Sequence, residues 1–244
     1  MALSAKDRSS KVRPNLPRLL GRLRARPGMA GFSISGVDVR RRVVVFIDYQ
    51  NVYMGARSAF DLARAPSTNG QIDPLALGRL LVDRSGSDRF LAGVRVYRGL
   101  PSLSRNPIGA RAAVLQTQAW QREPLVEVTT RPLAYRHDGS AVEKGIDVAL
   151  AVDVVAMAMA DEFDIGIVFS ADSDVLPALE VVGRRTFEKR METALWKPNG
   201  GRLTPLRFNQ GLGLPQPWCH FLDRSCYDLV ADGYNYASQK SRRR

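Results

Sequence analysis

The clearest pattern in the chain is an uninterrupted run of five apolar residues, Val43–Ile47. A strand that is apolar on both faces is typical of a parallel sheet covered by helices. Comparable short runs predict further strands at Val94–Tyr97, Val126–Thr130, Ile165–Phe169 and Thr193–Trp196. The pattern therefore predicts a sheet whose strands are buried on both sides.

Segments between these runs place apolar residues at helical spacing. They predict helices at Pro74–Val82, at Ala110–Arg122, at Ile146–Met159 and from about Val175 onwards. The third of these helices is apolar on nearly all sides, so we expect it to be almost wholly buried. Strands that alternate with helices of this length favour βαβ units with right-handed crossovers. We expect an α/β fold with a doubly wound parallel β-sheet flanked by helices.

The two ends of the chain differ in composition from this alternating region. Residues 1–42 are rich in Arg, Ser, Gly and Pro and poor in aromatics, which predicts a disordered basic tail. Residues 198–217 contain many Gly and Pro, which predicts an irregular connection, and a helix is expected at about Phe221–Leu229. We expect residues 198–239 to pack on a domain formed by residues 43–197, followed by a second basic tail, residues 240–244.

The formal charge of +12 is concentrated in these tails. Residues 1–42 hold eleven Lys and Arg against two Asp, and residues 240–244 hold four basic residues and no acidic one. The remainder has 21 basic and 22 acidic residues, so its charge is about −1. A uniformly basic binding surface on the domain is thereby excluded, and nucleic acid is expected to bind a local patch and the tails.

Cysteine and histidine are too scarce to suggest a structural metal site. The chain has two of each, Cys219, Cys226, His137 and His220, which does not favour zinc or a secreted disulfide framework. No segment approaches the roughly 18 apolar residues of a membrane span. These observations predict a cytoplasmic protein without a membrane span.

Acidic residues follow two of the predicted strands directly. Asp48 comes after Val43–Ile47, with Asn51 three residues later, and Asp172 and Asp174 come shortly after another strand. In open α/β sheets, ligands bind beyond the carboxyl ends of the strands. If these strands are neighbours, their carboxylates converge, and such crowding is tolerated when a cation or a proton lies between them.

A further carboxylate begins the apolar helix. Asp147 lies in its expected first turn, where the helix dipole favours a negative group. Asp153 is six residues further on and so points about 120° away around the helix axis, and we rank it below Asp147. Oxygen ligands without His or Cys favour Mg²⁺ or Mn²⁺, which retain water and take further ligands from substrate phosphate. The pattern is typical of phosphodiester hydrolysis.

Three ordered segments make the sequence recognisable. Phe46–Asn51, Lys144–Leu150 and Ser170–Asp174 resemble, in this order, the signature segments of NYN domains, which are a branch of the PIN-like nucleases. The resemblance runs from about Val43 to Trp196. It implies a PIN-like domain at residues 43–197 that cleaves RNA with a divalent metal ion and acts as an endoribonuclease.

The resemblance also implies roles for individual residues. The metal-site and catalytic carboxylates would be Asp48, Asp147, Asp172 and Asp174. Supporting polar groups would be Asn51, Ser170 and Ser173. Lys144 would contact a phosphate, and Glu143 and Asp153 are further candidates. Ala171 departs from the family pattern, in which glycine is usual, and this puts the tightness of the turn in question rather than the acidic site.

Each assignment has a rival interpretation. Asp48 and Asp172 both precede expected helices and could act simply as N-caps, a position at which aspartate is favoured. The domain as a whole could be a catalytically inactive nucleic-acid-binding or scaffold domain, or a PIN-type toxin ribonuclease. The complete acidic set favours the enzyme, because four uncompensated carboxylates would repel a phosphate ligand.

The charge distribution generates a prediction about the tails. Deleting both should weaken nucleic-acid binding most at low salt and flatten its salt dependence, by roughly 0.7 in slope for each phosphate of a single strand that the tails no longer neutralise. Cleavage at saturating substrate should persist. Binding constants over a salt series, together with turnover in Mn²⁺, measure both effects. Equal slopes for the full and shortened chains would locate the binding surface on the domain.

Overall fold

The computed structural model of the protein describes residues 40–186, 188–200 and 203–238. The predicted disordered tail and the basic C-terminal residues 240–244 therefore lie outside the described residues, apart from Arg40, Arg41 and Arg42. Arg41 and Arg42 already belong to the first strand of the domain.

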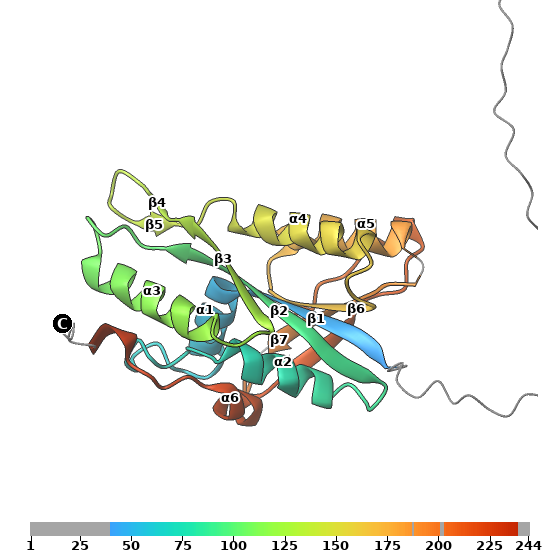
Figure 1. The fold of residues 1–244 in the computed structure, drawn as a ribbon, viewed down its shortest axis with the longest axis horizontal. Coiled ribbons are helices and arrows are strands. Elements are labelled where there is room, and N and C mark those ends of the chain that lie inside the picture. Colours follow the sequence, from blue (N-terminus) through green and yellow to red (C-terminus); the bar gives the residue numbers. More distant parts are fainter. Residues whose placement is uncertain (1–39, 187, 201–202, 239–244) are drawn as a thin grey trace, which may run out of the picture. The chain divides into compact units, whose positions relative to one another are not determined.

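The centre of the fold is a six-stranded sheet with all its strands parallel, in the order β3-β2-β1-β6-β7-β8 (Figure 1). Its strands are β1 (Arg41–Asp48), β2 (Arg89–Leu100), β3 (Val126–Pro132), β6 (Ile165–Phe169), β7 (Arg190–Trp196) and β8 (Trp218–Leu222). Strands β2 and β3 extend the sheet to one side of β1, and β6, β7 and β8 extend it to the other. The order reverses between β1 and β6, which is where open α/β sheets form their binding crevice.

Helices cover both faces of the sheet (Figure 1). They are α1 (Tyr49–Ala59), α2 (Pro74–Asp83), α3 (Pro107–Trp120), α4 (Ile146–Met159), α5 (Leu176–Arg185) and α6 (Arg224–Val230). The core on one face packs α4 and α5, and the core on the other packs α1, α2 and α6. A two-stranded hairpin, β4 (Ala134–Tyr135) and β5 (Ala141–Val142), lies outside the sheet. The predicted doubly wound α/β fold is confirmed.

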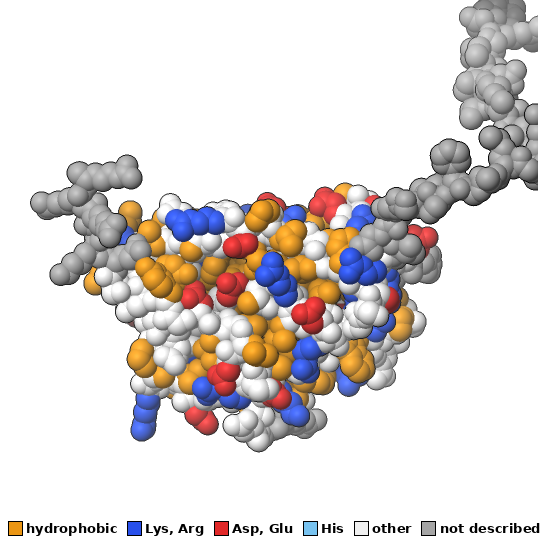
Figure 2. All heavy atoms as spheres, turned by 60° about the horizontal axis from the view of Figure 1, so that its bottom comes forward, with side chains coloured by type: hydrophobic (Ala, Val, Ile, Leu, Met, Phe, Trp, Pro, Cys, Tyr) orange, Lys and Arg blue, Asp and Glu red, His pale blue; other side chains and the backbone are white. Residues whose placement is uncertain are grey.

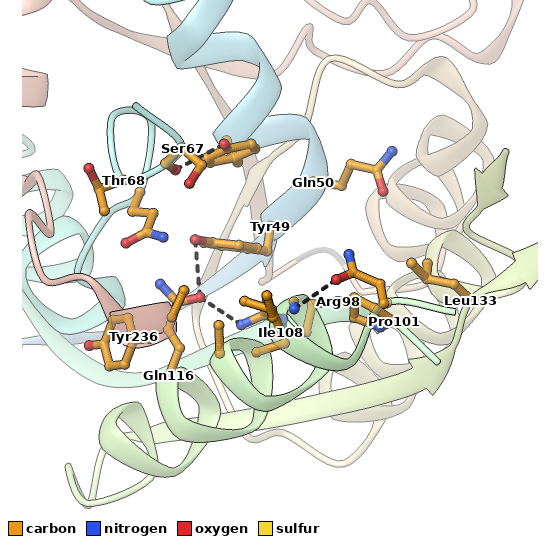
Figure 3. Close-up of a pocket in the computed structure, with 18 of the residues that line it drawn as sticks. Tyr49, Gln50, Ser67, Thr68, Arg98, Pro101, Ile108, Gln116, Leu133 and Tyr236 are labelled. Atoms are coloured by element: carbon orange, nitrogen blue, oxygen red, sulfur yellow. Dashed lines mark hydrogen bonds between the residues drawn. The ribbon is translucent and has the colours of Figure 1, made fainter. Parts of the chain in front are cut away.

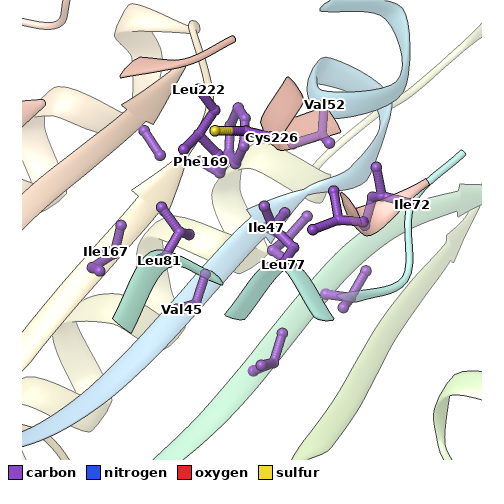
Figure 4. Close-up of a cluster of buried hydrophobic side chains, with 14 of the residues drawn as sticks. Val45, Ile47, Val52, Ile72, Leu77, Leu81, Ile167, Phe169, Leu222 and Cys226 are labelled. Atoms are coloured by element: carbon purple, nitrogen blue, oxygen red, sulfur yellow. The ribbon is translucent and has the colours of Figure 1, made fainter. Parts of the chain in front are cut away.

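Alternation along β1 supplies both cores. Val43, Val45 and Ile47 pack with α1 and α2, whereas Val44 and Phe46 pack with α4 and α5, and all five side chains are at most 2% exposed. Figure 4 shows the first of these cores. Such double burial accounts for the unbroken apolar run and fixes the register of the central strand.

The carboxyl-terminal part differs most from the sequence prediction. Trp218–Leu222 is a strand at the edge of the sheet, not part of an irregular segment or helix. The final helix begins only at Arg224, after Asp223, whose side chain accepts from the N–H of Cys226 at 3.1 Å. The strand is mostly apolar, but Trp218 and Phe221 are exposed and the buried His220 interrupts the run, so its pattern does not show which side is covered.

Helix α4 is also less buried than its composition suggests. Val148 and Val152 are each 59% exposed, and Met159 is 51% exposed. The expectation of an almost wholly buried helix is wrong, because one face of α4 packs on the sheet and nothing in the described part of the chain covers the opposite face. Hydrophobicity around the whole helix does not show which side is covered.

The surface of the domain mixes both signs of charge. Figure 2 shows Lys and Arg side chains interspersed with Asp and Glu over the face in view. This agrees with the nearly equal numbers of basic and acidic residues in the region that lies between the two tails. Within residues 40–186, 188–200 and 203–238, no helix has the length and apolarity needed to cross a membrane. The cytoplasmic location stays a prediction.

A buried cluster of charged side chains connects strands β7 and β8 to the start of β2. Glu192 is fully buried, and its Oε2 lies 3.0 Å from Arg89 Nη1 and 2.7 Å from His220 Nε2. Arg190 Nε lies 2.9 Å from the other carboxylate oxygen, without hydrogen-bond geometry. Burial by itself would raise the pKa of Glu192, but the bonds to His220 and Arg89 outweigh it and lower the pKa.

This cluster predicts a large cost for Glu192→Ala. The variant leaves Arg89 buried with only the exposed Asp88 nearby, so the free energy of unfolding should fall by about 3–5 kcal/mol. Because the folded pKa of Glu192 is lowered, the cluster's contribution is present above the unfolded pKa and is lost as pH falls through the folded one. Urea unfolding at several pH values measures it.

The matched control is Arg190→Ala. Its side chain is 49% exposed, and its removal should cost about 1 kcal/mol or less. Equal losses for the two variants would contradict a burial-dependent cluster.

Candidate functional site

The site begins where β1 ends. Asp48 is the last residue of β1 and also the N-cap of α1, and its Oδ1 accepts from the backbone N–H of Asn51 at 3.1 Å. Capping fixes the direction of this carboxylate, because the bond to the helix N-terminus holds the side chain over the turn. The side chain is 7% exposed, so it is held at the carboxyl edge of the sheet with little contact with water.

The turn after β6 is bonded directly to the turn after β1. Ser170 donates from Oγ to Asp48 Oδ2 at 3.1 Å, and the same Oγ accepts from the N–H of Asp172 at 3.1 Å. The N–H of Ala171 donates to Asn51 Oδ1, also at 3.1 Å. These bonds join the two turns at the point where the strand order reverses. They give Asn51 and Ser170 an orienting function.

The strand-end aspartates are helix N-caps and also line a pocket. Asp172, like Asp48, is an N-cap, and its Oδ1 accepts from the N–H of Asp174 at 2.9 Å to open a short 3-10 helix, η1 (Ser173–Val175). Both N-caps nevertheless line the same pocket. Capping and pocket lining are compatible, because a carboxylate oxygen accepts more than one bond.

The opposite wall comes from the start of α4. Gly145 precedes this helix with φ at +76°, a left-handed conformation that glycine adopts without steric cost. Before the glycine, Glu143 accepts from the N–H of Gly99 at 2.7 Å through Oε1. After it, Asp147 stands in the first turn of α4. The turn therefore brings two further carboxylates to one place.

Together these elements enclose a pocket of about 700 Å³ at the carboxyl edge of the sheet. Its acidic lining residues are Asp48, Glu143, Asp147 and Asp172. Asn51 also lines it, and so does Arg136 from the β4–β5 hairpin. The pocket thus combines four carboxylates with one basic side chain.

Two of these carboxyl groups hold their protons more strongly than usual. Burial raises the pKa of Asp48, bonds from Asn51 and Ser170 oppose the shift, and the charge of Asp172 adds to it. Burial likewise raises the pKa of Glu143, with further increases from the charges of Asp48 and Asp147. The carboxylates are therefore close enough to repel one another, and the pocket favours a cation or a proton.

The lining fits a metal ion held by few protein ligands. Among the residues described, no three His, Cys, Asp or Glu side chains lie close enough together to hold an ion as a group. The expected four-aspartate cluster is therefore not assembled as such. Mg²⁺ is commonly held by one or two carboxylates with several waters, and the coupled pair Asp48 and Asp172 suits that mode. The oxygen-only acidic lining fits a hard divalent cation.

Several predicted residues lie elsewhere. Asp174 is exposed and is not among the residues that line the acidic pocket, because the turn capped by Asp172 places it further along η1. Ser173 lines the neighbouring cavity instead. Lys144 is exposed and does not line the acidic pocket either, although Glu143 before it and Ile146 after it do.

Asp153 has a different partner. Its Oδ2 accepts from the hydroxyl of Tyr97 at 2.9 Å, and this bond joins α4 to β2 away from the pocket. Its lower rank, which followed from helix geometry, agrees with this placement. Glu143 was ranked equally low but lines the pocket, because the bond to Gly99 folds it back toward the strand ends.

Arg136 is the pocket residue that sequence reasoning missed. It lies in the short β4–β5 hairpin, 11 residues before Asp147 in the chain. No motif marks it, since two-residue strands leave no periodic signal. Only the fold brings this hairpin beside the acidic residues.

The acidic pocket shares lining residues with two further cavities, and we call the three together the groove. On one side it shares Gln50, Met54 and Glu143 with a cavity of about 540 Å³. On the other it shares Asn51, Gly55 and Ser58 with a cavity of about 790 Å³. Because each neighbouring cavity shares lining residues with the acidic pocket, an extended ligand could pass across the carboxylates and leave on either side.

Comparison with known proteins gives one family. The family described as NYN domain matches residues 42–198 of the chain. Among solved structures, a protein of unknown function from Vibrio parahaemolyticus is similar to this chain at 20% identity and a TM-score of 0.45, over 78% of this chain and 96% of its own. No curated protein matches the sequence.

The raised pKa of Asp48 predicts that Asp48→Asn stabilises the protein when divalent ions are absent. Folding becomes less favourable as pH rises from the usual value of 3.8 through the raised folded pKa, and asparagine does not titrate. Asparagine also caps helices as well as aspartate does. At pH 7 the free energy of unfolding should rise by on the order of 1 kcal/mol.

Urea unfolding in EDTA at pH 3.8 and pH 7 measures the difference, which should be small at the lower pH. Adding Mg²⁺ should stabilise the wild type more than the variant. A variant that is less stable at pH 7 would show that the bonds to the carboxylate outweigh its burial.

Proposed function

Because the chain belongs to the NYN domain family, we propose that it is a nuclease that uses a divalent metal ion to hydrolyse phosphodiester bonds. The observation that carries the proposal is the gathering of Asp48, Glu143, Asp147 and Asp172 around one pocket at the reversal of strand order. Such crowding costs stability unless a cation offsets it, so an acidic pocket of this kind is expected where function requires it.

In this proposal Asp48 and Asp172 hold Mg²⁺ or Mn²⁺, assisted by Asp147 and Glu143. A bound ion would supply an activated water and would offset negative charge on the phosphate. The chain's own contribution is placement. The N–H of Asn51 and the hydroxyl of Ser170 bond the carboxylate of Asp48, and the carboxylate of Asp172 accepts from the N–H of Asp174, so the positions of both carboxylates do not depend on the substrate.

Two groups are suited to the substrate phosphate. The N-terminus of α4 opens on the pocket through Ile146 and Asp147, and its N-cap Gly145 supplies no side-chain bond. Exposed N–H groups at a helix start, together with the helix dipole, favour an anion. Arg136 adds a guanidinium on the hairpin side. We assign it the phosphate-binding role that the sequence suggested for Lys144.

The groove supports internal cleavage. A strand that crosses the acidic pocket has a cavity on each side, so nucleotides before and after the scissile phosphate can both be accommodated. An enzyme that removed terminal nucleotides would instead be expected to close one side of its site. We therefore propose an endonuclease, with RNA as the substrate that the family resemblance implies.

The proposal predicts selective loss of cleavage. Asp48→Asn and Asp172→Asn should each lower the cleavage rate by about 100-fold or more, the order expected when one charged or hydrogen-bonding group is removed from a reacting centre. Asp174→Asn is the matched control, because it makes the same change in the same segment outside the pocket. It should retain activity within about tenfold.

Cleavage is measured on RNA and DNA of one sequence in Mg²⁺, Mn²⁺ and EDTA, with circular single-stranded RNA as an additional substrate. Cutting of the circle in Mn²⁺ but not in EDTA is the expected result. Failure of the wild type to cut any substrate would favour a nucleic-acid-binding domain without catalysis. A fully active Asp48→Asn variant would remove that residue from the catalytic set.

A further inference from the structure

The cavity beside the acidic pocket has a mixed aromatic and polar lining. It measures about 540 Å³, within the range of small-ligand sites. Tyr49, Tyr53 and Tyr236 contribute aromatic rings, and Arg98 and Gln116 contribute polar groups. Figure 3 shows Tyr49 from α1, Arg98 from β2, Gln116 from α3 and Tyr236 from the C-terminal segment around one space.

Arg98 is an unusual residue to find in such a place. Its side chain is buried, and its Cζ lies 4.8 Å from the Tyr49 ring centroid and 5.2 Å from that of Trp120. Its Nη1 donates to Gln116 Oε1 at 2.9 Å. In the part of the chain that the structure describes, it makes no ion pair with a carboxylate, and Glu143 acts on it only through its charge.

Two donors in this group lack partners. Arg98 Nε and Gln116 Nε2 are both buried and make no hydrogen bond within the described residues. Rotating the Gln116 amide to give Nε2 another position would break existing bonds. Its Oε1 already accepts from Arg98 and, at 3.4 Å, from the Tyr49 hydroxyl. A buried cation with unpaired donors is unfavourable for folding by itself. A ligand with hydrogen-bond acceptors would offset this cost.

We propose that this cavity binds one unpaired nucleotide of the strand on one side of the cleaved bond. The aromatic rings provide surfaces for the base, and Arg98 and Gln116 recognise its oxygen acceptors, which belong either to a base carbonyl or to a phosphate. The inference rests on the proposed function for the identity of the strand. A paired base would have to leave its duplex to enter, so single strands are preferred.

The test is a cycle of protein and substrate changes, performed in EDTA with the full chain so that binding is measured without cleavage. The probe is a single-stranded RNA decamer in which one abasic nucleotide is moved from position to position. Removing the stacked base should weaken wild-type binding about tenfold at one position. In Arg98→Met this position-specific effect should shrink to within about twofold.

Arg95→Met is the matched control. Arg95 lies three residues earlier on the same strand, pairs with Glu127 at 3.3 Å and does not line the cavity. Its abasic profile should equal that of the wild type. Tyr236→Ala, in the short surface helix η3 (Tyr236–Ser238), gives a second cavity variant whose folding does not depend on a buried side chain, and it should reduce the same effect.

A purely structural role for Arg98 predicts different stability and binding for Arg98→Met. If its stacking on Tyr49 and Trp120 mainly stabilises the fold, Arg98→Met should unfold more easily and retain the abasic profile. Under the proposal it should be at least as stable as the wild type, because an unpaired buried charge is removed. Urea unfolding and the binding profile therefore separate the two.

The source of the acceptors is resolved with a methylphosphonate placed at the same position. Where the abasic change weakens binding, an unchanged affinity for the methylphosphonate assigns the acceptors to the base, and a loss of affinity that Arg98→Met abolishes assigns them to the phosphate. Equal abasic profiles in the wild type and Arg98→Met, or equal affinity for duplex RNA, would overturn the proposal. Absence of cleavage with an intact position-specific effect would refute the nuclease and leave this nucleotide site standing.

Discussion

The hydrogen bond from Ser170 to Asp48 joins the ends of the two strands between which the order of the sheet reverses. Because all strands run parallel, their carboxyl ends lie along one edge, and the turns that leave β1 and β6 go to opposite faces. That divergence opens the crevice, and the bond holds its two sides in register. The caps of α1 and η1 and the wall formed by Asp147 and Glu143 are arranged around this point.

Two neighbouring sites along this edge hold charge of opposite sign that is not fully compensated. Carboxylates crowd the acidic pocket, and the guanidinium of Arg98 in the adjoining cavity has no paired acid among the described residues. Glu143 lines both, so its charge lies between the two. A nucleic-acid strand has the complementary pattern, since its phosphates suit metal ions and cations and its bases suit aromatic rings and donors. One nucleic-acid strand, with its metal ion, would therefore compensate the charge at both sites.

The sequence predicted the sheet well because its central strands are buried on both faces, a condition that leaves continuous apolar runs such as Val43–Ile47 and Ile165–Phe169. It did not predict β8, where His220 takes part in a buried ion cluster that no local pattern records. The exposed face of α4 was missed for the converse reason, since Val148 and Val152 are apolar without being covered.

For the site, the sequence located strand ends but not the directions of side chains. Asp48 and Asp172 were found because each closely follows a strand, and Asp174 was grouped with them because spacing alone does not show which residue caps the turn. Arg136, Arg98 and Gln116 reach the groove through tertiary contacts between distant segments. No signal within their own segments marks them.

Position 48 has an evolutionary consequence. An aspartate codon becomes an asparagine codon by one base change, and asparagine can serve the same helix cap, so the fold sets little barrier to this step. The nearby cavity and the basic tails would be untouched. Under the proposed function, a lineage could thus exchange cleavage of a strand for binding of that strand in a single mutation, and the fold would not favour the reverse change.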